Sequence, residues 1–143
     1  GIREPGAKDY MDFWGRLAGR GVDCQAVEGA LAGLTANAQI GGWYSRGGIS
    51  GYVYGVEVPA DYEGPVPEGM ALEDIPASDY LVFHHPPYDF EADDEAVWEA
   101  LREAVGERAE PPAGYAWRGD LPTWQRHDPE GMGQAWCRPV VKA

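Results

Sequence analysis

The chain has 143 residues, 11 Lys and Arg against 24 Asp and Glu, and a formal net charge of -13. A hydrophobic fraction of 44% with 12% aromatic residues is typical of a folded domain and excludes a disordered acidic chain. Nucleic acids and anionic membranes are bound through clustered Lys and Arg, so this composition disfavours both as partners of the domain itself.

The first part of the chain predicts two helices followed by two strands. Residues 9–18 place apolar side chains at i, i+3, i+4 and i+7, which forms one face of a helix. Asp23 is positioned as the N-cap of a second helix that begins at Cys24. Residues 39–46 and 51–58 then predict two strands, joined by a glycine turn into a hairpin.

Residues 59–69 are rich in Pro, Gly and acidic side chains and predict a linker. After it we expect a helix over 94–105, capped by Asp94 and stopped by Gly106. We expect a turn at 128–131 between the last two strands of the chain. The strands of this second part are predicted at 70–75, 80–85, 122–127 and 133–141.

This order of elements predicts an α+β fold. Two pseudo-symmetric β-α-β-β units are expected to form one antiparallel sheet with the helices on one face, the first unit lacking its opening strand. Residues 1–143 would form a single domain, with a first repeat at about 8–58, the linker, and a second repeat at about 70–143.

Only two cysteines occur, Cys24 and Cys137. One disulfide at most would not stabilise a secreted domain of this size, so we expect two small core thiols and a cytoplasmic location.

Four segments follow one another at a recognisable spacing. Residues 75–83 are followed by a helix that contains Trp98, then by residues 124–127 and 136–140. Residues 52–56 fit the first repeat of this arrangement. In this order the chain resembles the gyrase-inhibitor-like small-molecule-binding domain. That domain is also the effector-binding half of AraC-type and MerR-type transcription regulators.

The resemblance implies a ligand groove near the axis between the two units, walled by aromatic side chains. In that family a buried carboxylate on the penultimate strand often faces cationic drugs, since a desolvated cation is stabilised by aromatic faces and an opposite charge. The aligned residue here is Gln125, which can hydrogen-bond a ligand but brings no charge.

We therefore expect several aromatic residues to share one pocket with polar groups from the penultimate strand. Which face of the sheet forms it stays open. Glu57 is either a displaced pocket acid or a solvated strand residue. The candidate ligand-binding residues are Trp43, Tyr52, Tyr54, Phe83, Trp98, Trp124, Gln125, His127 and Trp136.

No metal and no cofactor are expected. His84 and His85 are neighbours on a strand and point to opposite faces, so they cannot ligate one ion together. A nucleophile pair of Cys137 with His127 is disfavoured because Cys137 lies in an apolar run that favours a buried, inert thiol.

The leading hypothesis is a module that binds an aromatic or amphipathic small molecule, as part of or related to a bacterial transcription regulator. Contact with DNA would then belong to an upstream domain of a longer parent chain. One alternative is a hydrolase of strained cyclopropane toxins that uses Gln125, His127, Glu57 and Tyr54. Another is a protein-binding domain of the gyrase-inhibitor kind with an acidic surface.

Overall fold

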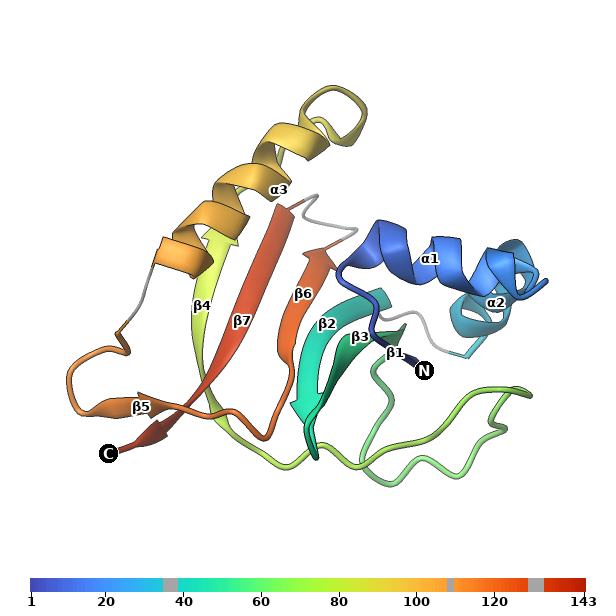
Figure 1. Cartoon of the computed structure of the whole chain (residues 1–143), viewed down its shortest axis with the longest axis horizontal. Helices are drawn as coiled ribbons and strands as arrows, with labels where there is room; N and C mark the ends of the chain where they lie inside the picture. Colours follow the sequence, from blue (N-terminus) through green and yellow to red (C-terminus); the bar gives the residue numbers. More distant parts are fainter. Residues whose placement is uncertain (35–38, 108–109, 129–132) are drawn as a thin grey trace.

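The computed structural model describes residues 1–34, 39–107, 110–128 and 133–143. The fold is of the mixed helix and strand class, with an open antiparallel sheet, as the sequence predicts (Figure 1). The described strands are β1 Ile2–Pro5, β2 Gln39–Arg46, β3 Ile49–Val56, β4 Asp79–His85, β5 Tyr115–Trp117, β6 Thr123–Asp128 and β7 Gly133–Lys142. The described helices are α1 Tyr10–Gly19, α2 Cys24–Ala32 and α3 Phe90–Glu107.

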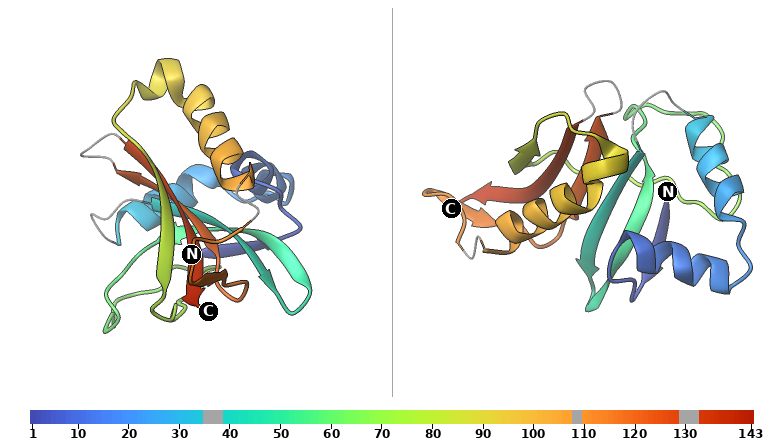
Figure 2. Two further views of the ribbon diagram at one scale, coloured as in Figure 1. Left: turned by 90° about the vertical axis from the view of Figure 1, so that its left-hand side faces the viewer. Right: turned by 90° about the horizontal axis from the view of Figure 1, so that it is seen from above.

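The strands are ordered β1-β3-β2-β6-β7-β4, and β5 pairs with the far end of β7. Helices α1 and α2 lie beside the part of the sheet made by β1 to β3, whereas α3 lies beside β4 and β7 (Figures 1 and 2). The two parts meet where β2 pairs with β6, with Trp43 opposite Thr123.

The second helix begins where the sequence predicts, and the first begins one residue later than predicted, at Tyr10, because Asp9 is its N-cap. The carboxylate of Asp9 accepts a hydrogen bond from the Asp12 amide at 2.8 Å, and that of Asp23 accepts one from the Ala26 amide at 3.2 Å. The apolar face of α1 then buries Phe13, which makes the first hydrophobic core together with β3.

The predicted hairpin is formed by β2 and β3, with Gly47 and Gly48 in the left-handed backbone region of the turn. A second pair of glycines lies inside β2. A methyl group at Gly41 would overlap the Tyr52 hydroxyl, and one at Gly42 would lie 2.7 Å from the Trp124 ring. These glycines therefore let aromatic side chains of neighbouring strands lie across β2.

The expectation that the first unit lacks its opening strand is wrong. Residues 2–5 form β1, which pairs with β3 so that Arg3 lies opposite Val53. The strand escapes detection because it is short, ends in a proline, and buries the charged Glu4, which is paired at 2.6 Å with Arg20.

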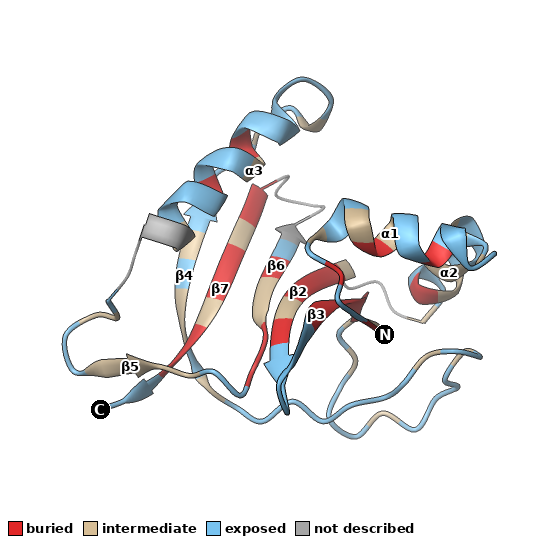
Figure 3. Ribbon diagram, in the orientation of Figure 1, coloured by how far each residue is buried: buried red, intermediate tan, exposed pale blue. Residues whose placement is uncertain are grey.

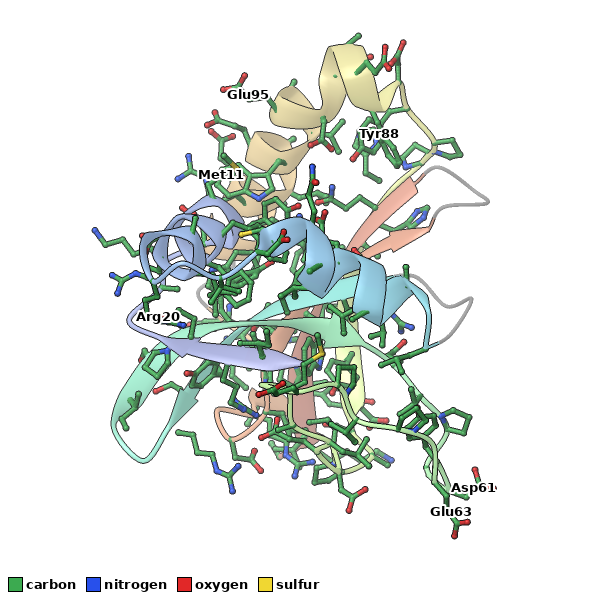
Figure 4. All side chains as sticks on the ribbon, turned by 90° about the vertical axis from the view of Figure 1, so that its right-hand side faces the viewer. Met11, Arg20, Asp61, Glu63, Tyr88 and Glu95 are labelled. Atoms are coloured by element: carbon green, nitrogen blue, oxygen red, sulfur yellow. The ribbon has the colours of Figure 1, made fainter. Side chains whose placement is uncertain are left out.

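Residues 70–75 are not a strand, contrary to expectation. The segment lies beside the first residue of the chain, where Ala71 and Gly1 exchange two backbone hydrogen bonds. It is also held by the Arg3–Glu73 salt bridge at 2.8 Å rather than by a strand ladder. Earlier in the same connection, Asp61 and Glu63 point away from the molecule (Figure 4), and both are exposed.

Helix α3 begins four residues earlier and ends two residues later than predicted. The carboxylate of Asp89 accepts hydrogen bonds from the amides of Glu91 and Ala92, so Asp89 and not Asp94 caps the helix. The helix also runs past Gly106 to Glu107. The short strand β5 was not expected, and the predicted turn at 128–131 falls almost wholly outside the described residues, apart from the last residue of β6.

Burial differs between the central strands of the sheet and helix α3. Red, buried segments run through β2, β3 and β7, while α3 is mostly exposed (Figure 3). Within the described residues, no helix combines the length and the apolar character needed to cross a bilayer.

Candidate functional site

The two predicted tyrosines of β3 are core residues. Tyr52 is 1% exposed and packs on Phe13, with ring centroids 5.8 Å apart, while Tyr54 packs on Phe13 and Trp14. Burial raises the pKa of both phenols, so both stay protonated at neutral pH. Neither lines the hollow described below.

Three further predicted residues form the core beneath α3. Trp136 is 3% exposed and packs with Val97 and Leu101 of the helix, and Phe83 and Trp98 close the sides of this cluster. Their role is to attach α3 to the sheet.

Trp124 lies on the other face of the sheet from Trp136. Its register partners are Gly42 and Cys137, whereas Trp136 lies opposite Gln125, and side chains alternate along each strand. The predicted aromatic set is therefore divided between two faces and does not line a single pocket.

Trp43 connects the two cores. Its ring contacts Tyr52 at a centroid distance of 5.4 Å and Trp136 at 4.7 Å, so it packs against both hydrophobic clusters. The indole Nε1 donates to the Lys8 carbonyl at 2.9 Å, which orients the ring. Its remaining surface faces a hollow in the protein.

Gln125 belongs to a buried chain of hydrogen bonds. Its Nε2 donates to Gln134 Oε1 at 3.0 Å, and Trp136 Nε1 donates to the same oxygen at 2.7 Å. Gln134 Nε2 in turn donates to the Tyr88 hydroxyl at 2.9 Å, which donates to Asp94 Oδ1 at 2.7 Å. Tyr88 lies two residues before the start of α3, near the protein surface (Figure 4).

These hydrogen bonds satisfy the buried amide side chains of Gln125 and Gln134, which are only 6% and 1% exposed. The position that the resemblance assigns to a carboxylate is thus neutral and already hydrogen-bonded within the protein. A carboxylate in the place of Gln125 could not donate a hydrogen bond to Gln134. The other members of this hydrogen-bond network therefore favour an amide at this position.

The hollow beside Trp43 has a volume of about 580 Å³. It lies between the β1–α1 loop, the β2–β3 hairpin and the β5–β6 connection, and Thr123 and Arg138 contribute from the central strands. This volume lies within the range of small-molecule sites, which is about 300–1,000 Å³. The described residues around it are Gly6, Ala7, Lys8, Trp43, Tyr44, Ser45, Ser50, Gly51, Trp117, Arg118, Gly119, Leu121, Thr123 and Arg138.

Most of this hollow was not predicted from the sequence, since Trp43 is the only one of the eight predicted site residues with a described side chain that lines it. Trp117 and Arg138 are the main omissions. Strand alternation could have found Arg138, because it lies two residues after Trp136 and shares its face. Nothing in the sequence indicates that the short strand β5 would bring Trp117 against Arg138.

A second hollow of about 600 Å³ lies beyond the hairpin, where the 70–78 segment passes the β5–β6 connection. Its charged residues are mixed in sign and include the Arg3–Glu73 pair. None of the predicted site residues whose side chains the structure describes lines this second hollow.

The residues considered for catalysis do not gather in either hollow. Glu57 lies just after β3 and forms an ion pair with Arg126. Both side chains are about half exposed, which fits a solvated residue rather than a pocket acid. Cys137 is buried, and burial raises the pKa of its thiol, which fits an inert core cysteine. The side chain of His127 lies outside the described set, and among described residues no three His, Cys, Asp or Glu side chains are grouped as metal ligands.

Comparison with protein-family models, curated proteins and solved structures gives no match to this chain. The function must therefore be inferred from the chain's own fold and hollow.

Proposed function

We propose that the chain is a small-molecule-binding module of the gyrase-inhibitor-like kind, with its ligand in the hollow beside Trp43. In this proposal two β-α-β-β units meet about a pseudo-twofold axis, all helices lie on one face of the sheet, and the ligand binds where the units meet.

The strand order supports the paired units. One half runs β1-β3-β2 and the other β4-β7-β6, and the halves join through the antiparallel β2–β6 pair. The corresponding strands therefore occupy corresponding places on either side of that join.

The helix contacts support a common face for the helices. Phe13 of α1 packs on Tyr52, and Leu101 of α3 belongs to the cluster around Trp136. Because Trp43 contacts both Tyr52 and Trp136, these two side chains lie on the same side of the sheet.

The observation that carries the proposal is the hollow itself. It has the volume of a small-molecule site, and it is lined by two tryptophans, Trp43 and Trp117, whose side chains have few rotatable bonds to order on binding.

Isothermal titration calorimetry with three naphthalene probes of one shape tests this function: 2-naphthoate, neutral 2-naphthamide and cationic 2-(aminomethyl)naphthalene. We expect at least one to bind with a Kd below about 1 mM and to change the tryptophan emission. Failure of all three to bind at that level would overturn the proposal.

A variant that fills the hollow locates the binding. Thr123→Phe places a ring in the hollow, and we expect it to weaken probe binding by about tenfold or more. Val82→Phe is the matched control, since Val82 is also a β-branched strand residue but is 53% exposed and lines neither hollow. Equal weakening by both variants would place the binding elsewhere.

The association with a transcription regulator is part of the proposal and depends on the parent gene. A helix-turn-helix coding segment in frame upstream of Gly1 is expected for an effector-binding half. Without such a segment, the same module would act as a stand-alone ligand binder. No observation favours the hydrolase or the protein-binding alternative.

A further inference from the structure

The two ends of the sheet are protected differently. Beside β1 lies the 70–75 segment, where Gly1 and Ala71 exchange backbone hydrogen bonds and Arg3 pairs with Glu73. At the opposite end, β4 pairs with β7 on one side, and the described part of the chain places no further strand on its other side (Figures 1 and 2). An uncovered strand edge is a template for pairing with another chain.

The backbone of β4 points alternately to β7 and to the open edge. Strands β4 and β5 pair with opposite edges of β7, and the Pro139 carbonyl accepts a hydrogen bond from the Arg118 amide at 3.0 Å on the β5 side. Pro139 therefore points away from its register partner Tyr80, and in an antiparallel pair Tyr80 then points away as well. By alternation Val82 and His84 also direct their N–H and C=O groups outward, where the described residues supply no hydrogen-bond partner.

Strand β4 lacks the features that commonly prevent edge pairing. Its seven residues contain no proline and no lysine, and its register with β7 runs from Asp79 to His85 without a bulge. Val82, at its centre, is 53% exposed. Pro76 and Pro86 lie outside the two ends of the strand, so they limit the length of a ladder without interrupting it.

The order of side chains along β4 is suited to pairing with a copy of itself. In an antiparallel pair of two β4 strands centred on Val82, the outward backbone groups of each strand meet those of the other. Side chains of matching character then lie opposite one another: Tyr80 with His84, Leu81 with Phe83, and Asp79 with His85. A shift of two residues would leave some of the outward groups unpaired, and a shift of one would set them against groups that point to β7.

We propose that two copies of the chain pair through β4 across a twofold axis at Val82, which joins their sheets into one. Asp79 of each copy then lies opposite His85 of the other, a side chain that can carry a positive charge. Because the β1 end is covered, each described sheet offers one open edge, and the pairing closes at two copies. The dimer does not depend on the proposed ligand function, since β4 lines neither hollow.

Electrostatic repulsion opposes this pairing. The twofold axis places both α3 helices on the same face of the joined sheet, and the charged residues of α3 are mostly acidic. Each chain also carries a formal net charge of -13. Salt screens this repulsion, so the dimer should tighten as the ionic strength rises. A dimer that weakens with added salt would contradict this arrangement of the helices.

Sedimentation equilibrium of the wild-type chain measures the association. At about 0.3 M salt we expect a monomer–dimer equilibrium with a Kd below about 100 μM, and a severalfold larger Kd at about 0.03 M salt. A chain that stays monomeric up to this concentration, or assemblies that keep growing beyond a dimer, would overturn the proposal.

Val82→Lys tests whether β4 is the interface. It places two ammonium groups opposite each other at the axis, so we expect the Kd to rise by about tenfold or more. Ile49→Lys is the matched control, because it makes the same change of charge at a strand residue that is 55% exposed but lies in β3 beside the hairpin turn. Equal Kd values for the two variants would rule out β4 as the interface.

A disulfide tests the register and decides the question even if Val82→Lys does not fold. Across the axis, the Cα atoms of the two copies of residue 82 lie about 5.5 Å apart, within the range of a disulfide, whereas the two copies of residue 84 are offset by about 14 Å along the strands. With the partly exposed Cys24 replaced by serine, we expect Val82→Cys to form a covalent dimer on mild oxidation and His84→Cys, also at an exposed position, to form little. Equal crosslinking of both variants, or none of Val82→Cys, would exclude the proposed pairing.

Discussion

The two halves of the sheet hold their helices by different means. On the first half, α1 and α2 contribute Phe13, Leu17 and Leu31, each at most 1% exposed, to an apolar core. On the second half, the buried apolar residues that α3 contributes to its cluster are Val97 and Leu101, each 5% exposed, from a helix of 18 residues. The attachment of α3 is completed by the polar chain through Gln134 and Tyr88.

This difference predicts unequal local stability. Apolar burial contributes roughly in proportion to area, whereas a satisfied buried hydrogen bond contributes about 1 kcal/mol net. We therefore expect α3 to open at a lower free energy than α1. The proposed ligand hollow is lined by residues of both halves, and none of its described lining residues belongs to α3.

The largest effect is expected for Phe13→Ala in the firm half. Phe13 is fully buried and its ring contacts Trp14, Tyr52 and Tyr54. Loss of the ring should lower the free energy of unfolding by about 3–5 kcal/mol, measured by urea denaturation. A loss below about 1 kcal/mol would show that this core is not tightly packed.

Leu101→Ala is the equivalent change in the half that carries α3, and it should lower the free energy of unfolding by less. We expect about 2–3 kcal/mol, at the low end for a buried leucine, because α3 is mostly exposed and can adjust over the gap. Native-state hydrogen exchange should show faster exchange confined to α3. Uniform acceleration across α1 and α3 would contradict separate local stability.

Much of the fold could be predicted because local signals and tertiary structure agree. The caps at Asp9 and Asp23, the period of α1 and the glycine turn of the hairpin are each encoded within a few residues. Strand β1 could not be predicted, since it depends on pairing with β3 and on Arg20 to satisfy Glu4.

The candidate site was harder to predict than the fold for a similar reason. A count of aromatic residues finds Trp43 and Trp136 but does not separate a pocket wall from a core residue, because both uses favour the same side chains. Two lining residues that such a count does not bring together, Trp117 of β5 and Lys8 of the β1–α1 loop, lie far apart in the sequence. Their meeting depends on β5 pairing with β7, and no local pattern encodes that pairing.

Gln134→Leu tests the polar attachment of α3 and should have a moderate effect. The change leaves Gln125 Nε2, Trp136 Nε1 and the Tyr88 hydroxyl each without one partner. We expect a loss of about 1–3 kcal/mol in the free energy of unfolding, measured by urea denaturation. Gln39→Leu is a comparison outside this hydrogen-bond network, because Gln39 accepts a hydrogen bond from Tyr54 in the other half of the sheet.

If the double variant Gln125→Leu with Gln134→Leu is no less stable than Gln134→Leu alone, the unpaired Gln125 amide accounts for part of the loss. If Gln134→Leu changes stability by less than about 0.5 kcal/mol, the polar chain does not hold α3.

The smallest effect concerns thiol reactivity and separates local from global opening. Cys137 is buried on the sheet face opposite Trp136 and α3, and burial raises the pKa of its thiol, whereas Cys24 is partly exposed at the start of α2. With a disulfide reagent at pH 8, we expect Cys24 to react faster by about tenfold or more, and both thiols to react alike in denaturant. Since the raised pKa means less thiolate at a given pH, the rate at Cys137 should keep rising at a pH where an unperturbed thiol has levelled off.

Combining this assay with Leu101→Ala tests the comparison of the two halves directly. If α3 opens locally, Leu101→Ala should leave the reaction rate of Cys137 within about twofold of the wild-type rate. The reason is that this thiol lies on the face of the sheet that α3 does not cover. A rise at Cys137 in proportion to the lost stability would mean that opening is global. The two halves would then be one cooperative unit.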